Sequence, residues 1–516
     1  ADELMTRLSA AARTIAWTSD DTWSRVRSSL TGPLGRLARR DRRVAPGLVL
    51  REGEVHLGPD ADVAGDPVLA LRGAAAAAVA STTIDRPSLE RLAADAPAMP
   101  DPWPPEARDR LVELLRAGPA AVGLVEALEQ RSLWLRILPE WANVRSRPQR
   151  NAYHRYTVDR HLVEAAVNAG ALATRVGRPD LLVVGALLHD LGKGWPGDHT
   201  EVGMVLARTI GTRMGFAAAD VDVLVTLVEH HLLLPDVATR RDLDDPGTIQ
   251  RVVAAVGSAE VLDLLGALTE ADSLATGPAA WGPWKADLVQ ELVTRTHHVL
   301  GGGTAHEAVS DEFPTTAQRD LMTRRETVVA GDGDVLVVVA PDRPGLFARV
   351  AGVLALHGLA VLAALADSDD GGMAVEQFQV EPAFGPVIPW DRVRVDVELA
   401  LAGRLAIHAR LEERAQRYAR RVPAAASPAI TKVAFDNVVS EVATVVEVQA
   451  ADAVGVLYRI TRALADLDLN IRSAKVQTLG PQVVDSFYVS TASGTKLTEP
   501  DHLVELERAV LHALSG

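Results

Sequence analysis

The residues of this chain that are best suited to chemistry are histidines and aspartates in its middle third. His161 lies in YTVDRHLVEA, His189 and Asp190 lie in ALLHDLGKG, and Asp272 lies in LTEADSLA, each within an apolar helical pattern. A buried aspartate is unfavourable unless its charge is compensated, which neutral imidazoles cannot do and a divalent cation can. The residues that together indicate a metal site are His161, His189, Asp190, His199, His231 and Asp272, with His230 as a weaker candidate.

A simpler interpretation exists for each of these residues taken alone. A single histidine in a helix is usually a surface residue or a hydrogen-bonded core residue. His189 and Asp190 could also mark the end of a helix, with Gly192 as the stop. This interpretation accounts for the local residues but not for the candidates far along the chain, so a metal site explains the whole set better.

Composition and charge exclude several classes of protein. The chain has 516 residues, which suggests three or four domains, and its content of 48% hydrophobic and 23% charged residues is ordinary for a globular protein. A net charge of -15 argues against a nucleic-acid binder, because phosphate binding needs a basic face. Since the sequence shows no cysteine, no membrane-spanning stretch and no signal peptide, we expect a cytoplasmic location and no membrane partner.

The residue pattern divides the chain into five segments. Residues 1–145 have apolar residues at helical spacing between proline-rich turns and predict an all-α connector region. Residues 146–300 continue the helical pattern and carry the metal-ligand candidates. After a linker at 301–330, short apolar strands alternate with helices, and this predicts two α+β domains at 331–420 and 441–516.

The last third of the chain contains an internal duplication. DRPGLFARVAGVLALHGLAV begins at Asp342 and DAVGVLYRITRALADLDLNI begins at Asp452, an offset of 110 residues. In each copy one β-rich run precedes this segment, two follow it, and a helix comes next. The order predicts two ferredoxin-like βαββαβ units, because repetition of this quality rarely arises by chance.

The spacing of His161, His189-Asp190 and Asp272 resembles that of the HD superfamily of metal-dependent phosphohydrolases. The resemblance implies that these four residues bind a divalent cation, with Mn²⁺ or Mg²⁺ favoured, and that His199 and His231 can hold a second one. Such a metal would lower the pKa of a bound water and polarise a phosphoryl oxygen. Asp190 and Lys193 are the expected catalytic residues, and Lys193 could neutralise charge on the phosphate, although it could also be a solvated lysine after a helix stop.

Longer stretches resemble one group in particular, the bifunctional PII uridylyltransferase/uridylyl-removing enzyme family. They are HRYTVDRH, GDHTEVG, RRDLDDP and TEADSLATGPAAWGPWKADLV. The resemblance implies an HD domain followed by two amino-acid-binding ACT domains, with nucleotidylated PII protein as the partner and glutamine as the effector. The implied activity is removal of UMP or AMP from a modified tyrosine of PII. Arg240 and Arg241 are candidates for binding the nucleotide phosphate, and a surface salt-bridge role is equally compatible with the sequence.

The two repeats carry a common Asp-x-x-Gly turn, Asp342 to Gly345 and Asp452 to Gly455. In the first, the aspartate could take a ligand's ammonium group while the N-terminus of the proline-opened helix receives its carboxylate. The second copy keeps both of these residues but loses the arginine and the proline, so amino-acid binding is less secure there. Plain helix capping is the alternative for both turns.

The chain departs from the family pattern in one respect. The transferase domain of the family is marked by a Gly-Ser turn followed by an Asp-x-Asp pair, and neither Gly257-Ser258 nor Asp60-Ala-Asp62 has that context. We therefore expect no transferase activity, and the start at ADELMTRL favours a chain cut after that domain over a natural short form. Association through the edges of the ACT sheets is a further expectation.

Two alternative functions stay open at this point. One is a guanosine-tetraphosphate-type hydrolase, whose family also joins HD to ACT but carries a synthetase domain between them. Here only TRTHHVLGGGTAHEAVSDEFPTTAQRD separates the two. The other is a non-catalytic amino-acid-sensing scaffold, against which the complete ligand set argues.

Overall fold

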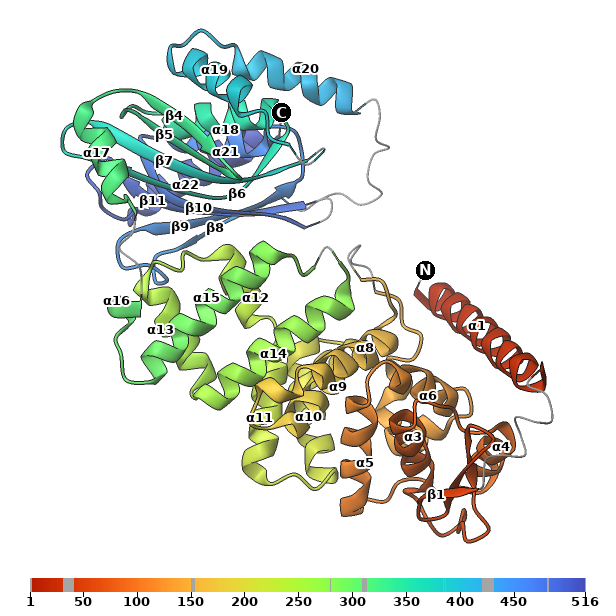
Figure 1. Cartoon of the computed structure of the whole chain (residues 1–516). Coiled ribbons are helices and arrows are strands. Elements are labelled where there is room, and N and C mark those ends of the chain that lie inside the picture. The colour runs from red at the N-terminus through yellow and green to blue at the C-terminus, as the bar shows by residue number, and fades with distance from the viewer. Residues whose placement is uncertain are drawn as a thin grey trace. The chain divides into compact units, whose positions relative to one another are not determined.

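The computed structural model of the chain forms two compact units (Figure 1). The first consists of Ala1–Leu234 and Ala255–Val293, and the second of Pro235–Ala254 and Thr294–Gly516. The chain therefore passes from one unit to the other three times, within α12 (Leu233–Arg240), α13 (Pro246–Val256) and α15 (Pro283–Leu300). The residues that the structure describes are 2–30, 41–149, 154–278, 280–308, 313–383, 385, 387–419, 431–479 and 482–515.

The N-terminal part of the first unit is mostly helical, as predicted, and departs from the all-α prediction in one stretch. Three short strands form an antiparallel sheet. Pro46-Gly47 and Glu52-Gly53 make the turns between them, with both glycines at positive φ, a backbone conformation that glycine adopts without strain. The elements are α1 (Asp2–Leu30), β1 (Arg42–Ala45), β2 (Leu48–Arg51), β3 (Glu54–Leu57), α3 (Leu69–Val79), α4 (Arg86–Asp95), α5 (Pro105–Arg116), α6 (Ala120–Glu129) and α7 (Leu133–Ile137).

The helices that carry the metal-ligand candidates surround one buried helix. They are α8 (Val158–Ala171), α9 (Pro179–Leu188), η3 (Leu191–Gly194), α10 (His199–Arg213), α11 (Ala218–Glu229) and α14 (Ala259–Thr276). From Leu181 to Leu188, α9 is buried at every position, because its apolar residues cover all sides. The helices α8, α10, α11 and α14 pack against it. No single helix of the described residues has the length and apolarity to cross a membrane; only α13 and α14 taken together, with a 100° bend between them, reach that composition.

The second unit contains one eight-stranded antiparallel sheet that joins both repeats. The first repeat supplies β4 (Val328–Asp332), β5 (Val335–Pro341), β6 (Leu359–Ser368) and β7 (Met373–Pro382), and the second supplies β8 (Lys432–Asp436), β9 (Thr444–Ala451), β10 (Leu469–Leu479) and β11 (Gln482–Thr491). The strand order is β4-β5-β7-β6-β10-β11-β9-β8. The repeats meet where β6 pairs with β10, with Ala364 opposite Ala474.

Each repeat has the expected β-α-β-β-α order. The sixth element, predicted as a strand after the last helix, is instead a strand that comes before the first strand of the repeat in the sequence. In a ferredoxin-like unit the sixth element is an edge strand beside the first strand. Here β4 takes that place beside β5, and β8 takes it beside β9. The helices are α18 (Leu346–Leu356), α19 (Trp390–Leu401) and α20 (Ile407–Ala419) in the first repeat, and α21 (Val456–Ala465) and α22 (Pro500–Leu514) in the second. The expected linker contains α16 (Ala305–Ala308) and α17 (Thr316–Arg324), and its residues 309–312 lie outside the described residues.

The strand residues that face these helices form a continuous apolar core with one acid in each repeat. Alternate side chains of a strand point to the same face. On β7 the core residues Ala374 and Phe378 flank Glu376, and on β11 Val483 and Phe487 flank Asp485. Both acids are buried, with 3% and 0% of their surface exposed. The acids hold equivalent positions, since Glu376 pairs with β5 and β6 as Asp485 pairs with β9 and β10.

Candidate metal centre and effector pockets

The candidate metal ligands stand at the ends and inner faces of the helices around α9. His189 is the C-cap residue directly after the end of α9 at Leu188, and Asp190 follows it. His199 begins α10, where the carboxylate of Asp198 caps the helix by accepting from the N–H groups of Thr200 and Glu201. His231 follows the end of α11, while α8 and α14 contribute side chains from their inner faces. The ends of α9 and α11 and the start of α10 therefore lie close together, and this brings their polar residues to one site.

Three side chains form the first ligand group. The Nε2 atoms of His161 and His189 lie 3.4 Å apart. The Oδ1 atom of Asp272 lies 3.0 Å from Nε2 of His161 and 3.5 Å from Nε2 of His189. One nitrogen or oxygen atom from each of the three side chains thus faces a common point, as a metal ion requires.

Asp190, His199 and His231 form a second ligand group beside the first. One oxygen of Asp190, Oδ2, lies 3.4 Å from Nε2 of His189 in the first group. Its other oxygen, Oδ1, lies 3.7 Å from Nε2 of His231 and, although buried, has no hydrogen-bond partner in the described ranges. Asp190 therefore faces both groups, and its unpartnered oxygen is what a second cation would satisfy.

The backbone fixes the orientation of two histidine rings. Nδ1 of His189 lies 2.8 Å from the carbonyl oxygen of Ala186, and Nδ1 of His231 lies 2.7 Å from that of Val228. A carbonyl can only accept, so each Nδ1 carries the proton and donates it. Each Nε2 then presents a lone pair toward the ligand groups when the ring is neutral, which is the form that binds metal. The residues present fit a divalent cation.

Burial and neighbouring charges set the protonation of the site. Burial alone would lower the pKa of His189, but the carboxylates of Asp190 and Asp272 outweigh it and raise this pKa to about 10. Burial would raise the pKa of both aspartates, but His189 holds them well below their usual range. Burial lowers the pKa of His231. Without a cation, then, a proton on His189 compensates the carboxylates, and we infer that a metal competes with this proton.

Lys193 lies beside Asp190, although α9 ends before it. The chain continues from α9 into the short helix η3, and the ammonium group of Lys193 forms an ion pair with Oδ2 of Asp190. It also donates to the Oε1 atom of Gln149 over 3.3 Å. The side chain keeps 28% of its surface exposed, so its ammonium group can meet a ligand that enters from solvent.

His154 is a residue of the site that the sequence interpretation missed. Its ring centre lies 5.3 Å from that of His161, and its buried Nδ1 atom has no partner within the part of the chain that the structure describes. Burial, together with the charges of Lys193 and His161, lowers the pKa of His154 to about 4. The residue lies within HRYTVDRH but ahead of the helix, where helical spacing cannot relate it to His161. His230 belongs to neither ligand group.

Glycines bring the ligand-bearing helices into close contact. Gly192 does not end a helix, as the simpler interpretation supposed, because α9 ends at Leu188. A Cβ atom on Gly192 would lie 2.0 Å from the carbonyl oxygen of His199 and 2.7 Å from the backbone nitrogen of Gly203. Only glycine therefore lets η3, which follows Asp190, touch the first turns of α10, which begins with His199.

Comparison with known proteins gives the same two kinds of domain. The HD domain family model matches residues 158–277, which contain all six candidate ligands. The family model of the ACR family N-terminal ACT domain matches residues 439–514. A bifunctional uridylyltransferase/uridylyl-removing enzyme of Streptomyces coelicolor is 42% identical, over 96% of this chain and 67% of its own length. This chain belongs to the bifunctional uridylyltransferase/uridylyl-removing enzyme family.

Other members of this family are also similar to the chain. The enzyme of Mycobacterium tuberculosis H37Rv is 39% identical over 98% of this chain, and that of Gluconobacter oxydans is 34% identical over 75% of it. The chain spans 67%, 65% and 48% of the lengths of these three relatives, so it corresponds to about two thirds or less of each curated protein. Family membership confirms the resemblance drawn from the motifs, and the HD match makes the chain an HD-superfamily hydrolase.

In this chain, Arg240 and Arg241 have partners inside the second unit. Nε of Arg240 donates to Oε1 of Gln477 on β10 over 3.3 Å, and Arg241 lies 3.6 Å from Glu447 on β9. The adjacent Asp242 accepts a hydrogen bond of 2.6 Å from Ser473. The ion pairs of Arg240 with Asp236 over 3.5 Å and of Arg241 with Glu447 are compatible with the salt-bridge role that the sequence left open. A role in binding the nucleotide phosphate stays a prediction.

In the two Asp-x-x-Gly turns of this chain, the aspartate does not cap the helix that follows. Both helices are capped by glycine instead, Gly345 for α18 and Gly455 for α21, each with a φ of 78° and no capping side chain. Pro344 precedes this cap, so it does not open the helix as expected. Asp342 and Asp452 each line a pocket instead. Their side chains are therefore free of the capping role that competed with ligand binding.

We expect Asp485→Asn to stabilise the chain increasingly as the pH rises. Burial raises the pKa of Asp485 to about 8, whereas an unfolded aspartate titrates near ~3.9. Between these values the folded chain keeps a proton that the unfolded chain releases, so the free energy of unfolding falls with pH by up to about 1.4 kcal/mol per unit. Asparagine removes this loss. Urea unfolding at pH 5, 6, 7 and 8 would test this, and an equal difference between variant and wild type at every pH would contradict it.

Proposed function

We propose that this chain is a metal-dependent phosphodiesterase that removes UMP or AMP from the modified tyrosine of PII nitrogen-regulatory protein. The proposal depends on one observation above all, that Asp190 faces both ligand groups and pairs with Lys193. A divalent cation bound there, with Mn²⁺ or Mg²⁺ favoured, would supply a nucleophilic water and polarise the phosphoryl oxygens. Membership of this family supports PII as the partner, and the proposed setting is the cytoplasm.

The side chains of the site would have different roles toward a bound phosphodiester. His161, His189 and Asp272 would hold a first cation, with Asp190 beside them, and Asp190, His199 and His231 would hold a second. Lys193 contributes a positive charge within reach of solvent, where it can neutralise charge that develops on the phosphate. His154, uncharged at neutral pH, can accept or donate a hydrogen bond to the substrate beside His161.

We further propose that glutamine regulates this hydrolase through the ACT pair. Each repeat offers a pocket at its Asp-x-x-Gly turn, with Asp342 and Gly345 in one and Asp452 and Gly455 in the other. A helix N-terminus lies at each turn, and its free N–H groups suit the carboxylate of an amino acid. The outer strands β4 and β8 leave sheet edges through which two chains could associate.

The test uses purified chain and PII that carries either UMP or AMP on its loop tyrosine. The mass of PII is followed with and without Mn²⁺ and glutamine, with Asp190→Asn as the control. We expect loss of the nucleotide in the wild type only, and the faster substrate identifies the natural modification. An unchanged PII mass in every sample with bound metal would contradict the proposal and favour the small-nucleotide hydrolase or the sensing scaffold.

The substitution Lys193→Met is expected to slow hydrolysis without removing the metal. It deletes a charge that pairs with Asp190 but is not itself a metal ligand, so kcat should fall by roughly 10²-fold. Metal content by mass spectrometry should stay at the wild-type value. Lys432→Met, which removes an exposed lysine in β8, is the matched control and should leave kcat unchanged. Equal kcat values for both variants would exclude a catalytic role for Lys193.

A further inference from the structure

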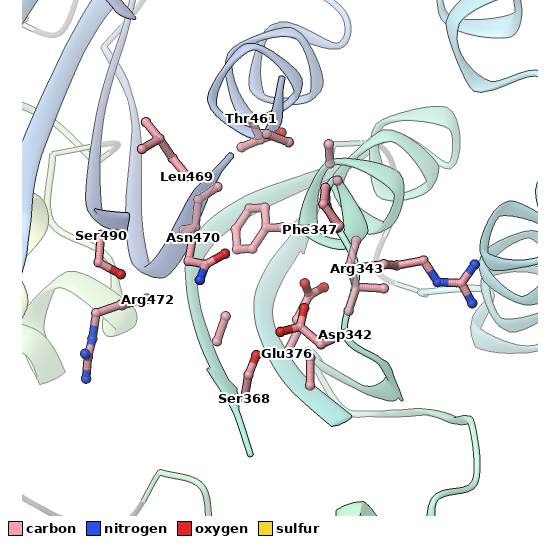
Figure 2. A pocket seen from close by; sticks show the side chains of 18 of the residues that line it. Asp342, Arg343, Phe347, Ser368, Glu376, Thr461, Leu469, Asn470, Arg472 and Ser490 are labelled. Atoms are coloured by element: carbon pink, nitrogen blue, oxygen red, sulfur yellow. The ribbon is translucent and has the colours of Figure 1, made fainter. Parts of the chain in front are cut away.

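The pocket at Asp342 is built from both repeats. The first repeat contributes Asp342 and Glu376, and the second contributes Asn470 and Ser490, around a cavity of about 240 Å³. Figure 2 shows the two acids on the side of α18 and Asn470 on the side of the second repeat, while the guanidinium group of Arg343 points away. That group lies near the carbonyl oxygen of Leu401 instead. The pocket therefore presents two acids to a ligand of small-molecule size.

Glu376 is the unusual residue of this pocket. It has 3% of its surface exposed, and its Oε2 atom has no hydrogen-bond partner among the described residues. Burial raises the pKa of Glu376 well above its usual range, and the nearby charge of Asp342 acts in the same direction. A buried carboxyl without a partner costs stability that an apolar residue at this position would not cost. Its burial next to a cavity is explained if a ligand satisfies it.

The pocket at Asp452 differs in this respect. It is lined mainly by apolar side chains, among them Val361, Val454 and Leu457. Asp485, which occupies the position equivalent to Glu376, does not line it. The longer side chain of glutamate reaches the cavity in the first repeat, whereas that of aspartate stays in the core of the second. The two pockets thus share a backbone plan, but the second lacks the buried carboxyl group and much of the polar lining of the first.

We propose that Glu376 is the residue that selects the effector of this chain, by binding the ammonium group of an amino acid in the first pocket. Asp342, at the exposed edge, contributes the second carboxylate, and Asn470 of the other repeat contacts the far end of the ligand. The N-terminus of α18 receives the ligand carboxylate. The second pocket, which lacks this carboxyl, does not select for an ammonium group. This inference rests on the proposed function, in which an amino acid regulates the chain.

An ammonium group suits these two acids better than a metal ion does. Divalent cations in proteins take several oxygen or nitrogen ligands. Among the described residues, the clusters of three or more possible metal ligands are the two in the HD domain. An ammonium group needs fewer partners, and its charge-assisted hydrogen bonds to carboxylates are strong ones. A pocket that bound divalent cations through Glu376 and Asp342 would contradict the inference.

The test compares L-glutamine with 4-carbamoylbutanoate, which is glutamine without its α-amino group. Binding of each to the full chain is measured by isothermal titration calorimetry. The wild type should prefer glutamine by about 30-fold or more, because the analogue leaves the buried carboxyl unpaired. In Glu376→Gln, which keeps the shape of a protonated glutamate, this preference should fall below about threefold.

The matched control is Asp485→Asn, which neutralises the equivalent acid of the second repeat. It should bind glutamine within about twofold of the wild type and keep the full preference over the analogue, since Asp485 lines neither of these two pockets. If Glu376→Gln weakened both ligands by the same factor, Glu376 would be a structural residue and the inference would be wrong. A wild type that bound neither ligand would also overturn it.

Hydrolysis of nucleotidylated PII without glutamine is measured on the same preparations, and it separates this inference from the function on which it rests. Selective glutamine binding by a wild type that hydrolyses no PII would contradict the phosphodiesterase and support the pocket assignment. Hydrolysis by a chain in which Glu376→Gln keeps its preference for glutamine would contradict only the pocket assignment.

Discussion

Asp190→Asn is expected to lower the rate of nucleotide removal by at least about 10³-fold and to reduce the metal content of the chain. The reason lies in the position of this side chain, whose two oxygens face the two ligand groups. Asparagine has nearly the same shape but no charge, and its amide nitrogen cannot bind a cation. The substitution also removes one of the two carboxylates that raise the pKa of His189, so less charge is left to hold a metal.

Metal content and activity should fall together in this variant, while the fold remains. Inductively coupled plasma mass spectrometry would measure the metal, and circular dichroism would verify the helices. Asp222→Asn is a matched control, because Asp222 is an exposed acid of α11 that pairs with Arg208. Full metal content and full activity in Asp190→Asn would show that the two ligand groups do not share this residue.

Gly192→Ala should destabilise the chain by at least about 3 kcal/mol. The added methyl group would overlap with the backbone of His199 and Gly203, and backbone atoms cannot rotate away as a side chain can. The contact can be relieved only if α10 moves away from η3. Because α10 begins with His199, the second ligand group would open as well, and its metal should be lost first.

Gly123→Ala provides the comparison for this prediction. Gly123 lies in α6, where an added methyl group meets no atom within 4 Å. Alanine should therefore stabilise the helix by about 0.5–1 kcal/mol. Urea unfolding of both variants would measure the difference, and equal free energies of unfolding would mean that the contact between η3 and α10 does not matter for stability.

The candidate site could be predicted from the sequence to the extent that its residues interrupt a regular pattern. His161, His189, Asp190 and Asp272 stand out because polar residues at buried helical positions need an explanation. His154 lies outside any helix or strand, where no period relates it to its neighbours. Arg240 has one local partner, Asp236, but Gln477 and Glu447, which contact Arg240 and Arg241, lie more than 200 positions along the chain, so no local pattern could have found them.

The fold shows the same division between local and distant information. The duplication predicted two copies of one unit, since each copy contains its own strands and helices. It could not predict that β6 and β10 would join them into one sheet, because strand pairing depends on contacts between segments far apart. Glu376 and Asp485 were detectable in principle, as acids within alternating apolar strands, but their alternation is short.

The three passages of the chain between its compact units limit how evolution can recombine this protein. Residues 235–254 belong to the second unit, yet they lie between His231 and Asp272 in the sequence. A gene fusion that moved the HD coding region alone would carry this segment away from Gln477 and Ser473, which hold Arg240 and Asp242. A fusion that moved the ACT pair alone would leave the segment behind. The HD domain and the ACT region of this chain are therefore expected to be inherited or lost together rather than exchanged as separate modules.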